Sequence, residues 1–525
     1  MPMIRTVALM TALACACTAQ AAASAAEPRH EATPQSSIDD LVFGRLKQLG
    51  IEPAEPCTDA VFLRRAFLDL IGTLPTPKEA RQFLQDRSPG KRPTLVDQLL
   101  EREEFADYWA MRWSDVLRIK AEFPINLWPN AAMAYYRWVR TCVKENMPYD
   151  QFARELLTSS GSNFRVPAVN FYRAMQSKEP ETLAKAVALA FLGARAEKWE
   201  KSRFAAMAAL FSQVGFKGTQ EWKEEIIFFD RVKASKEAGS DAVKAAAFPD
   251  GTLAKLSPDK DPRAAFADWL MSPENPWFAR AHVNRVWFWL LGRGIVHEPD
   301  DIRPDNPPSN PELLDQLQRD FIACKYDFKQ LCRRIVNSKV YQLSAIPKGN
   351  DPAGEANFAF YPMRRLDAEV LIDALNQITG TGEEYSSAIP EPFTWIPEDR
   401  RSIALPDGSI SSSFLEMFGR PSRDTGLLSE RNNTPTPGQR LHILNSSHVR
   451  RKIGESKILQ PMIRGGKSQR GAATELYLAI LSRFPTEEEL GIVKTYSEAG
   501  EAQGQEALVD VAWALFNSVE FLYRH

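Results

Sequence analysis

Apolar residues recur at helical spacing along almost the whole chain, and this pattern restricts the possible folds most. In AVFLRRAFLDLIG (60–72), Phe62, Ala66 and Leu70 recur every four residues and therefore share one helix face. The same spacing continues through 91–161 and 181–215, and no window shows the sustained alternation of a β-strand. We therefore predict a mainly α fold.

Chain length and a change in composition indicate two domains. A chain of 525 residues is longer than one ordinary hydrophobic core requires. Residues 231–262 are rich in Lys, Ala, Gly, Pro and Asp and poor in large apolar residues, which is typical of a linker. We predict a helical N-terminal domain over 36–230 and a helical C-terminal domain over 263–525. The Pro- and Ser-rich stretch 384–425 predicts loops or short strands within the second domain.

The first residues have the pattern of an export signal. Arg5 precedes a short apolar run, and small residues follow, so cleavage after Ala21 or Ala26 fits the usual rule. We predict a signal peptide over 1–26 and a mature protein in the periplasm or on the cell surface. An uncleaved anchor helix and a lipid anchor at Cys15 are the less favoured alternatives.

Four cysteines remain after this predicted cleavage, namely Cys57, Cys142, Cys324 and Cys332. Three pairings are possible in an oxidising compartment, and the spacing does not choose among them. Cys324 and Cys332 flank a predicted turn, so they are candidates for one pair; buried free thiols are the alternative. No C-x-x-C pair occurs, which argues against a zinc ribbon or a thioredoxin-type site.

Charge and motifs exclude several classes of function. The formal net charge is −2 and the pI is about 6.4, so no basic excess indicates nucleic-acid binding. No apolar segment after the signal is long enough for a transmembrane span. The chain contains no H-E-x-x-H, G-x-S-x-G or P-loop motif, and His442 and His448 are poorly spaced for shared metal ligation. We predict no metal site, and the motifs leave open whether the protein is an enzyme.

The segment ENPWFARAHVNRVWFWLLGRG (274–294) contains the highest density of aromatic residues. Asn275 is a good N-cap and Gly292 a good C-terminal exit, so we predict a helix over 276–291. Apolar side chains point in nearly every direction around this helix, which predicts that it is buried. It is too short and too charged for a membrane span.

Polar residues of this helix and of the loop that follows form a candidate site. Arg280 and Asn284 share one helix face, and Asp300, Asp301 and Arg303 follow on a Pro-rich loop. One interpretation is a polar binding site where these five side chains converge. The other interpretation, which we favour, is a buried ion-pair network that fixes the loop.

Two long stretches resemble the paired domains of a family of exported proteins from planctomycetes and verrucomicrobia. The first is DAVFLRRAFLDLIGTLPTPKEARQFLQDRSPGKRPTLVDQLLEREEFADYWAMRWSDVLR (59–118), and the second begins with DPRAAFADWLMSPENPWFARAHVNRVWFWLLGRGIVHEPDD (261–301) and continues through VNSKVYQLS, RRLDAEVLIDAL, FGRPSR and LHILN. The two stretches resemble domains of unknown function 1549 and 1553, respectively, which the planctomycete cytochrome-c-associated proteins carry as a pair. The resemblance implies an envelope protein that acts near c-type cytochromes and polysaccharide-degrading machinery, without a settled reaction.

The chain departs from this family at its redox segment. Relatives commonly carry C-x-x-C-H-x-H-P after the helix that resembles ALAFLGAR, which is typical of covalent haem attachment. Here the chain passes from Arg195 to Trp199 without Cys or His, and GLLSERN (426–432) also lacks a Cys that relatives tend to have. We therefore expect no covalent haem and no other cofactor.

The motifs shared with the second domain define the candidate binding cluster, and mixed Arg and carboxylate groups suit anionic or hydroxylated glycans. Its members are Arg280, Asn284, Asp300, Asp301, Arg303, Arg365, Glu369, Arg420, Glu430, Arg431 and His442, with Arg364 and Asp367 in the same motifs. We hypothesise a haem-free envelope protein that binds a glycan or a partner protein. The alternative is a polysaccharide-processing enzyme that uses this cluster.

Overall fold

The computed structural model describes residues 36–397, 399–464, 468–499 and 505–525. The described chain is mainly helical, which confirms the predicted fold class. The predicted signal peptide and Cys15 lie outside the described residues. In the part of the chain that is described, no helix is both long enough and apolar enough to cross a membrane.

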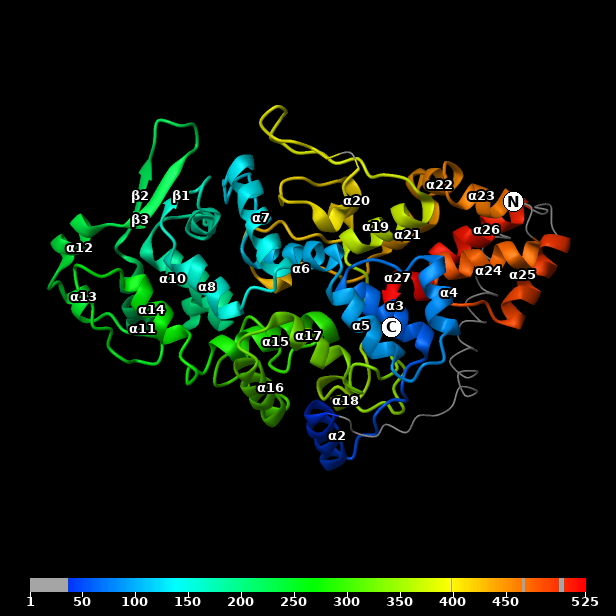
Figure 1. The fold of residues 1–525 in the computed structure, drawn as a ribbon, viewed down its shortest axis with the longest axis horizontal. Coiled ribbons are helices and arrows are strands. Elements are labelled where there is room, and N and C mark those ends of the chain that lie inside the picture. The colour runs from blue at the N-terminus through cyan, green and yellow to red at the C-terminus, as the bar shows by residue number, and fades with distance from the viewer. Residues whose placement is uncertain (1–35, 398, 465–467, 500–504) are drawn as a thin grey trace.

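The first half of the chain forms helices and one small sheet (Figure 1). Its helices are α2 (Ser37–Leu49), α3 (Asp59–Leu70), α4 (Pro77–Gln85), α5 (Lys91–Leu100), α6 (Glu103–Val116), α7 (Pro129–Lys144), α8 (Tyr149–Thr158), α9 (Asn170–Arg173), α10 (Pro180–Val187), α11 (Lys201–Ala208), α12 (Arg231–Glu237) and α13 (Asp241–Lys244). A π-helical turn, Ala188–Leu192, extends α10. The strands are β1 (Gly161–Ser162), β2 (Val214–Gly218) and β3 (Glu225–Phe229).

The second half is also built from helices, and it contributes one two-stranded sheet. Its elements are α14 (Pro262–Leu270), α15 (Phe278–Leu291), α16 (Pro311–Ala323), α17 (Phe328–Val336), α18 (Ala353–Ala356), β4 (Arg364–Arg365), α19 (Ala368–Thr379), α20 (Ser413–Met417), α21 (Pro437–Asn445), α22 (Ser447–Gly454), α23 (Leu459–Arg464), α24 (Gln469–Ile480), α25 (Glu487–Ala499), α26 (Gln505–Phe516), α27 (Val519–Leu522) and β5 (Tyr523–Arg524).

Both sheets are antiparallel. The first has the order β1-β3-β2, with Gly161 opposite Ile227 and Val214 opposite Phe229, and its β2–β3 hairpin projects from the molecule in Figure 1. The second pairs Arg364 with Arg524 and so joins the last described residues to the start of α19. Neither sheet was predicted, because strands of two to five residues are too short to show a clear alternation.

Local capping signals agree with the structure. The Thr76 side chain accepts from the Glu79 amide at 3.3 Å, and Glu79 Oε2 accepts from the Thr76 amide at 2.8 Å. This is the reciprocal capping box that TPKE predicts for α4. In α15 the side chain of Asn275 accepts from the amide of Phe278 at 3.0 Å, so the helix begins at Phe278, two residues later than predicted.

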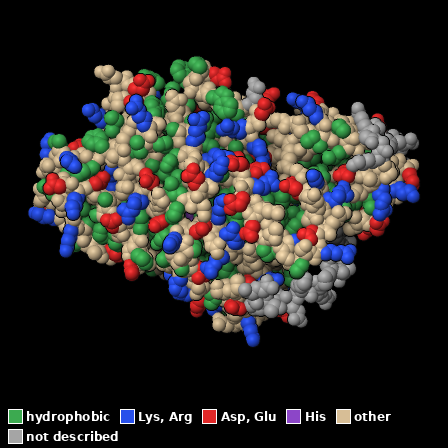
Figure 2. Space-filling view, in the orientation of Figure 1, with side chains coloured by type: hydrophobic (Ala, Val, Ile, Leu, Met, Phe, Trp, Pro, Cys, Tyr) green, Lys and Arg blue, Asp and Glu red, His purple; other side chains and the backbone are tan. Residues whose placement is uncertain are grey.

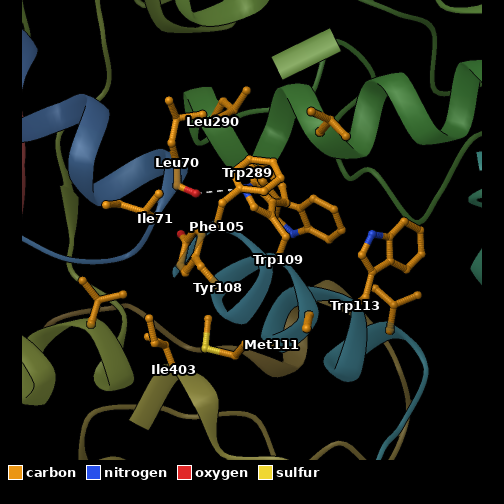
Figure 3. Close-up of a cluster of buried hydrophobic side chains, with 14 of the residues drawn as sticks. Leu70, Ile71, Phe105, Tyr108, Trp109, Met111, Trp113, Trp289, Leu290 and Ile403 are labelled. Atoms are coloured by element: carbon orange, nitrogen blue, oxygen red, sulfur yellow. Dashed lines mark hydrogen bonds between the residues drawn. The ribbon is translucent and has the colours of Figure 1, made fainter. Parts of the chain in front are cut away.

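The two halves of the sequence share one hydrophobic core. Helix α14 packs on α8, α15 on α3, α17 on α5, and α24 on α4. Trp109 of α6 lies at the centre, where its ring centroid is 5.6 Å from Trp289 of α15 and 4.8 Å from Phe328 of α17 (Figure 3). Its indole N–H donates to the carbonyl of Leu70 at 3.0 Å. The all-round apolarity of α15 is therefore satisfied by contacts with both halves, as its predicted burial requires.

The two segments predicted to be irregular contain some regular structure. Within 231–262, α12 and α13 form and Ala247 pairs with Leu253 in an isolated bridge. Within 384–425, a 3-10 turn (Ser402–Ala404) and α20 interrupt long loops.

Candidate functional site

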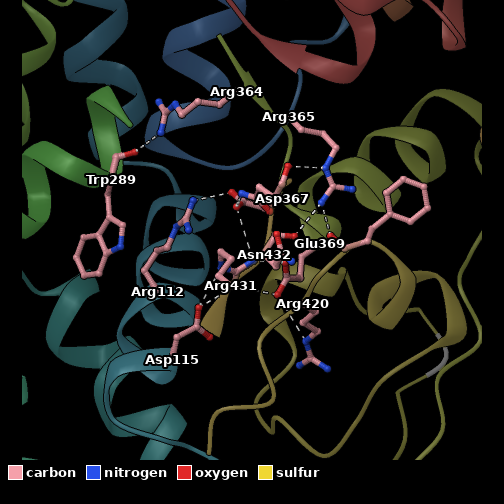
Figure 4. Close-up of polar contacts among 12 residues, drawn as sticks. Arg112, Asp115, Trp289, Arg364, Arg365, Asp367, Glu369, Arg420, Arg431 and Asn432 are labelled. Atoms are coloured by element: carbon pink, nitrogen blue, oxygen red, sulfur yellow. Dashed lines mark hydrogen bonds and ion pairs between the residues drawn. The ribbon is translucent and has the colours of Figure 1, made fainter. Parts of the chain in front are cut away.

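A buried network of arginines and carboxylates lies where α6 meets the start of α19 (Figure 4). Arg431 is its centre: its Nη2 is 2.7 Å from Asp115 Oδ2 of α6, and its Nη1 is 2.6 Å from Glu369 Oε2 of α19. Arg423 Nε also donates to Asp115, at 2.9 Å. We call Arg112, Asp115, Asp367, Glu369, Arg420, Arg423, Arg431 and Arg524 the central ion network.

Asp367, the residue before α19, extends this network toward the last described strand. Its Oδ2 accepts from Arg112 Nη2 at 2.6 Å and from Arg524 Nη2 at 2.9 Å. Its Oδ1 accepts a hydrogen bond from the side-chain Nδ2 of Asn433 at 2.7 Å. The network thus holds together α6 of the first half, α19 and β5 of the second half, and the loop at 423–433.

Two arginines of this region donate hydrogen bonds to backbone carbonyls. Arg365 donates to the carbonyls of Phe418 at 2.6 Å, Asn432 at 3.1 Å and Asn433 at 3.2 Å. Arg420 donates to the carbonyls of Ile410 and Asp407 and lies 3.5 Å from Glu369 Oε1. These contacts fix the loops of the irregular stretch against α19.

Electrostatic coupling in the network is strong. Burial alone would raise the pKa of Asp367, but Arg112, Arg524 and Arg431 outweigh it and hold that pKa well below its ordinary value. Burial opposes the charge of Arg431 too, yet the carboxylates of Asp115, Glu369 and Asp367 raise its pKa well above the ordinary value. Burial lowers the pKa of Arg420 to about 10.

The central ion network is closed to large molecules. The side chains of Asp115 and Arg431 are each 8% exposed, and those of Asp367 and Glu369 are completely buried. Buried charges of this kind must be paired, and here each carboxylate is neutralised by arginines of the same chain. The arrangement can fix loops and join the two halves, whereas a glycan cannot reach it without opening the core.

The residues predicted from α15 and the next loop do not converge on one site. Arg280 points to α16, where it pairs with Asp315 and donates to Gln318 at 3.1 Å. Asn284 forms two hydrogen bonds of 2.9 Å with the backbone of Val296 and so fixes the start of the loop. The idea that both side chains face the Asp300–Asp301 loop was wrong, because Arg280 lies on the α16 side of α15.

The buried partner of Asp300 is Arg285, which the sequence interpretation missed. Arg285 Nη2 lies 3.3 Å from Asp300 Oδ1, and its Nη groups also donate to the carbonyls of Leu189 and Ala190 at 2.9 and 2.8 Å. Asp300 Oδ2 accepts from the Leu428 amide at 2.6 Å, while burial raises its pKa. The favoured interpretation was therefore incorrect in its members: the buried ion pair of this loop joins Asp300 to Arg285, whereas Arg280 pairs with Asp315.

The remaining predicted residues do not gather at one site, although Asp301 and Arg303 pair with each other. Asp301 pairs with Lys198 and Arg303, each at 3.2 Å, near the surface, and Arg303 also pairs with Asp305 at 2.8 Å. Glu430 accepts from the amides of Asp424 and Thr425 at 2.9 and 3.3 Å, so it caps a turn. Arg364 donates to the carbonyls of Trp289 and Leu290, at 3.1 and 2.7 Å.

His442 and His448 are closer than their spacing suggested. A helix break at Ser446 separates α21 from α22 and brings the two rings to 5.7 Å between centroids. His448 lies 3.0 Å from Glu383, which also pairs with Lys452 at 3.3 Å. Even so, among the described residues no three His, Cys, Asp or Glu side chains are arranged to hold a metal ion.

The four cysteines expected in the mature chain are free thiols in this structure. Cys57, Cys142 and Cys332 are buried, and Cys324 is partly exposed. Burial raises the pKa of the Cys332 thiol well above its ordinary value, so that thiol is inert.

Charged residues within an apolar helix were the missed signal for the central ion network. Arg112 and Asp115 lie three residues apart in YWAMRWSDVL, and both are buried in α6. Charged side chains are almost never fully buried unless they are paired, so their position among aromatic residues indicates a paired site. Which partners they meet depends on residues about 250 to 310 positions away, which spacing along the chain cannot reveal.

Exposed aromatic side chains gather on three loops at one edge of the molecule. Trp222 is 67% exposed at the turn of the β2–β3 hairpin, and Phe393 is 54% exposed on the long loop after α19. Trp128, just before α7, lies between them, with ring centroids 6.3 Å from Trp222 and 5.8 Å from Phe393. We call these three residues the aromatic surface. Figure 2 shows hydrophobic side chains at the upper edge of the molecule, where the loop that follows α19 projects in Figure 1.

The fold and the network together define a mainly helical protein whose two sequence halves are joined by a buried ion network. Residues 37–214 match the family model described as a protein of unknown function, DUF1549 (PSCyt2), and residues 262–497 match the one described as a protein of unknown function, DUF1553 (PSD1). The chain therefore belongs to the family of proteins that carry these two domains in this order. No curated protein and no solved structure matches the chain significantly.

Proposed function

We propose that this protein is an exported, haem-free binding protein of the cell envelope that holds a glycan on its aromatic surface. The observation that carries the proposal is the cluster on three separate loops of the exposed Trp222 and Phe393 and the partly buried Trp128 between them. Exposed apolar patches of this kind mark interaction sites on soluble proteins. Export to the periplasm or cell surface would place this surface among polysaccharides.

The three aromatic rings are inclined to one another. The planes of Trp128 and Trp222 are inclined by 83°, and those of Trp128 and Phe393 by 58°. Sugar rings present an apolar C–H face that stacks on an aromatic ring, while their hydroxyl groups need polar neighbours. The Lys223 ammonium lies 5.3 Å from the Trp128 ring centre and 5.4 Å from that of Trp222, so a hydrogen-bond donor stands beside both rings.

The backbone that presents these rings is held in uncommon conformations. The φ angles of Asn126, Trp128 and Lys223 are 59°, 72° and 60°. Residues other than glycine rarely adopt such positive φ angles. Such conformations persist only where surrounding contacts impose them, and they are found preferentially at binding sites. A bound glycan would therefore meet a preorganised surface.

Contacts to neighbouring loops impose this arrangement. The amide of Ala121 donates to Asp407 Oδ1 and that of Glu122 to Ser409 Oγ, both at 2.9 Å. Glu122 Oε1 accepts from the Ala388 amide at 2.9 Å and so ties the loop of Phe393 to that of Trp128. The aromatic surface thus depends on contacts between both sequence halves.

A glycan suits this surface better than a protein partner does. A stable protein interface covers about 800 Å² on each partner and has a packed apolar centre. The aromatic surface instead consists of three rings on three separate loops, with ring planes inclined by 83° and 58° to that of Trp128. The polysaccharide-processing alternative is less well supported, because the central ion network on which it depended is buried and neutralised within the chain.

Binding to a glycan array, followed by titration calorimetry with the best glycan, tests the proposal. Trp222→Ala should weaken binding about tenfold or more, the effect of removing an aromatic side chain at the centre of an interface. Leu253→Ala is the matched control, since Leu253 is equally exposed but lies outside the aromatic surface. No glycan bound by the wild type, or equal binding by the Trp222 variant, would overturn the proposal.

A further inference from the structure

His282 of α15 is completely buried, yet neither of its ring nitrogens has a hydrogen-bond partner. Its ring is stacked between Tyr149, 3.8 Å away, and Phe321, 4.9 Å away, with Trp113 at 5.7 Å. A buried polar group without a partner is destabilising, so such a group calls for a missing partner.

A small cavity lies beside this ring. Its volume is about 20 Å³, and its lining combines the aromatic rings of Trp113, Phe152 and Phe328 with the side chains of Cys142, Asn146, Met147, Tyr149 and His282. A cavity of this size holds about one water molecule and no organic ligand. Its occupant is therefore a single water or a single metal ion.

The donor atoms that line the cavity favour a soft metal ion. They include an imidazole from His282, a thiol from Cys142 and a thioether from Met147, beside the neutral amide of Asn146 and hydroxyl of Tyr149, and no carboxylate lines the cavity. Ca²⁺, Mg²⁺ and Mn²⁺ prefer oxygen ligands, whereas thiolate and thioether ligands select Cu(I). Cys142 and Met147 are held together at the end of α7 by a 2.8 Å hydrogen bond from the Met147 amide to the Cys142 carbonyl.

We propose that this cavity is a binding site for one Cu(I) ion, with Cys142, Met147 and His282 as its ligands. The third donor is a thioether, which explains how a site can form although the described residues hold no group of three His, Cys, Asp or Glu suited to a metal. The proposal is independent of the aromatic surface and of glycan binding.

Charge balance favours a monovalent ion. When Cu(I) binds, the Cys142 thiol releases its proton to solvent and an S–Cu bond forms, so one thiolate cancels one positive charge. A divalent ion would leave a net charge in an apolar cavity, which is costly.

Anaerobic titration of the purified protein with Cu(I), in competition with the chromophoric chelator bicinchoninate, tests the site. The wild type should retain one equivalent, and X-ray absorption should show sulfur and nitrogen ligands. Cys142→Ser should lower the affinity by about tenfold or more, as should Met147→Leu, a partly exposed and size-conserving change that preserves the fold. Cys332→Ser, at a buried thiol outside the cavity, should bind like the wild type.

Three outcomes would overturn the assignment. The first is no Cu(I) retained by the folded wild type, which leaves the cavity to water. The second is unchanged affinity in both the Cys142 and the Met147 variants while circular dichroism shows native folding. The third is equal affinity for Zn(II), which would contradict selection by soft donors and charge.

Discussion

Arg431 and Asp115 form a buried ion pair between residues 316 positions apart in the sequence. Arg431 Nη2 and Nε lie 2.7 and 3.2 Å from Asp115 Oδ2. Asp115 belongs to α6 and Arg431 follows the loop after α20, so this pair connects the two sequence halves. The same guanidinium also pairs with Glu369. Removing the Arg431 side chain therefore leaves two carboxylates, those of Asp115 and Glu369, without this partner.

We expect Arg431→Ala to destabilise the protein strongly. The substitution leaves the buried carboxylates of Asp115 and Glu369 without their main partner, and breaking such a pair costs about 3–5 kcal/mol. Urea denaturation followed by circular dichroism measures the loss. Arg303→Ala, which breaks only partly exposed pairs, should change the free energy of unfolding by less than about 1 kcal/mol. Similar small losses in both variants would contradict a central role for Arg431.

The two arginines of α15 should behave differently. Arg285→Ala leaves the buried Asp300 unpaired and removes donors to the carbonyls of Leu189 and Ala190, so we expect a loss of about 3 kcal/mol or more. Arg280→Ala breaks a solvent-accessible pair with Asp315 and should cost at most about 1 kcal/mol. Thermal unfolding of both variants checks this order, and the reverse order would contradict the assignment of Arg285.

Glycan binding should depend on Glu122, although Glu122 is not one of the aromatic residues proposed to contact the glycan. Glu122→Ala removes the acceptor for the amide of Ala388, so the loop that carries Phe393 loses its link to Trp128. We expect a several-fold loss of glycan affinity in calorimetry with little change in thermal stability, because ordering the loop then costs binding energy. Glu52→Ala, at an exposed residue of another loop, is the control. Unchanged affinity would show that the loop is positioned by other contacts.

Stability should fall on acidification below pH 6.5 because of His282. Burial lowers its pKa well below the ordinary value of 6.5, so the folded state keeps it neutral while the unfolded state takes up a proton. The contribution of this group is complete above pH 6.5 and is lost as the pH falls toward the folded-state pKa. Urea denaturation of wild type and His282→Phe between pH 7 and about 5 should show a weaker pH dependence in the variant. Parallel curves would contradict a neutral, buried imidazole.

The sequence was informative wherever structure depends on neighbouring residues. The TPKE segment predicts its capping box because both partners lie three residues apart, and α15 is buried because its own residues are apolar on every side. It was less informative for ion pairs. Arg280 and Arg285 are both arginines of one helix, and which one meets Asp300 depends on how α15 packs against α16 and the turn at 188–192.

Sequence alone determined the mainly α fold, the capped helix ends, the burial of α15 and the membership of the paired-domain family, because each is encoded in local spacing or in contiguous motifs. The tertiary structure decided that, of the predicted residues, only Asp367, Glu369, Arg420 and Arg431 enter the closed ion network. It likewise decided that Trp128, Trp222 and Phe393 meet on one surface. It also decided that Cys142, Met147 and His282 line one cavity. Such groupings arise from packing between helices distant along the chain, and no local rule encodes the distance between two side chains that only the folded core brings together.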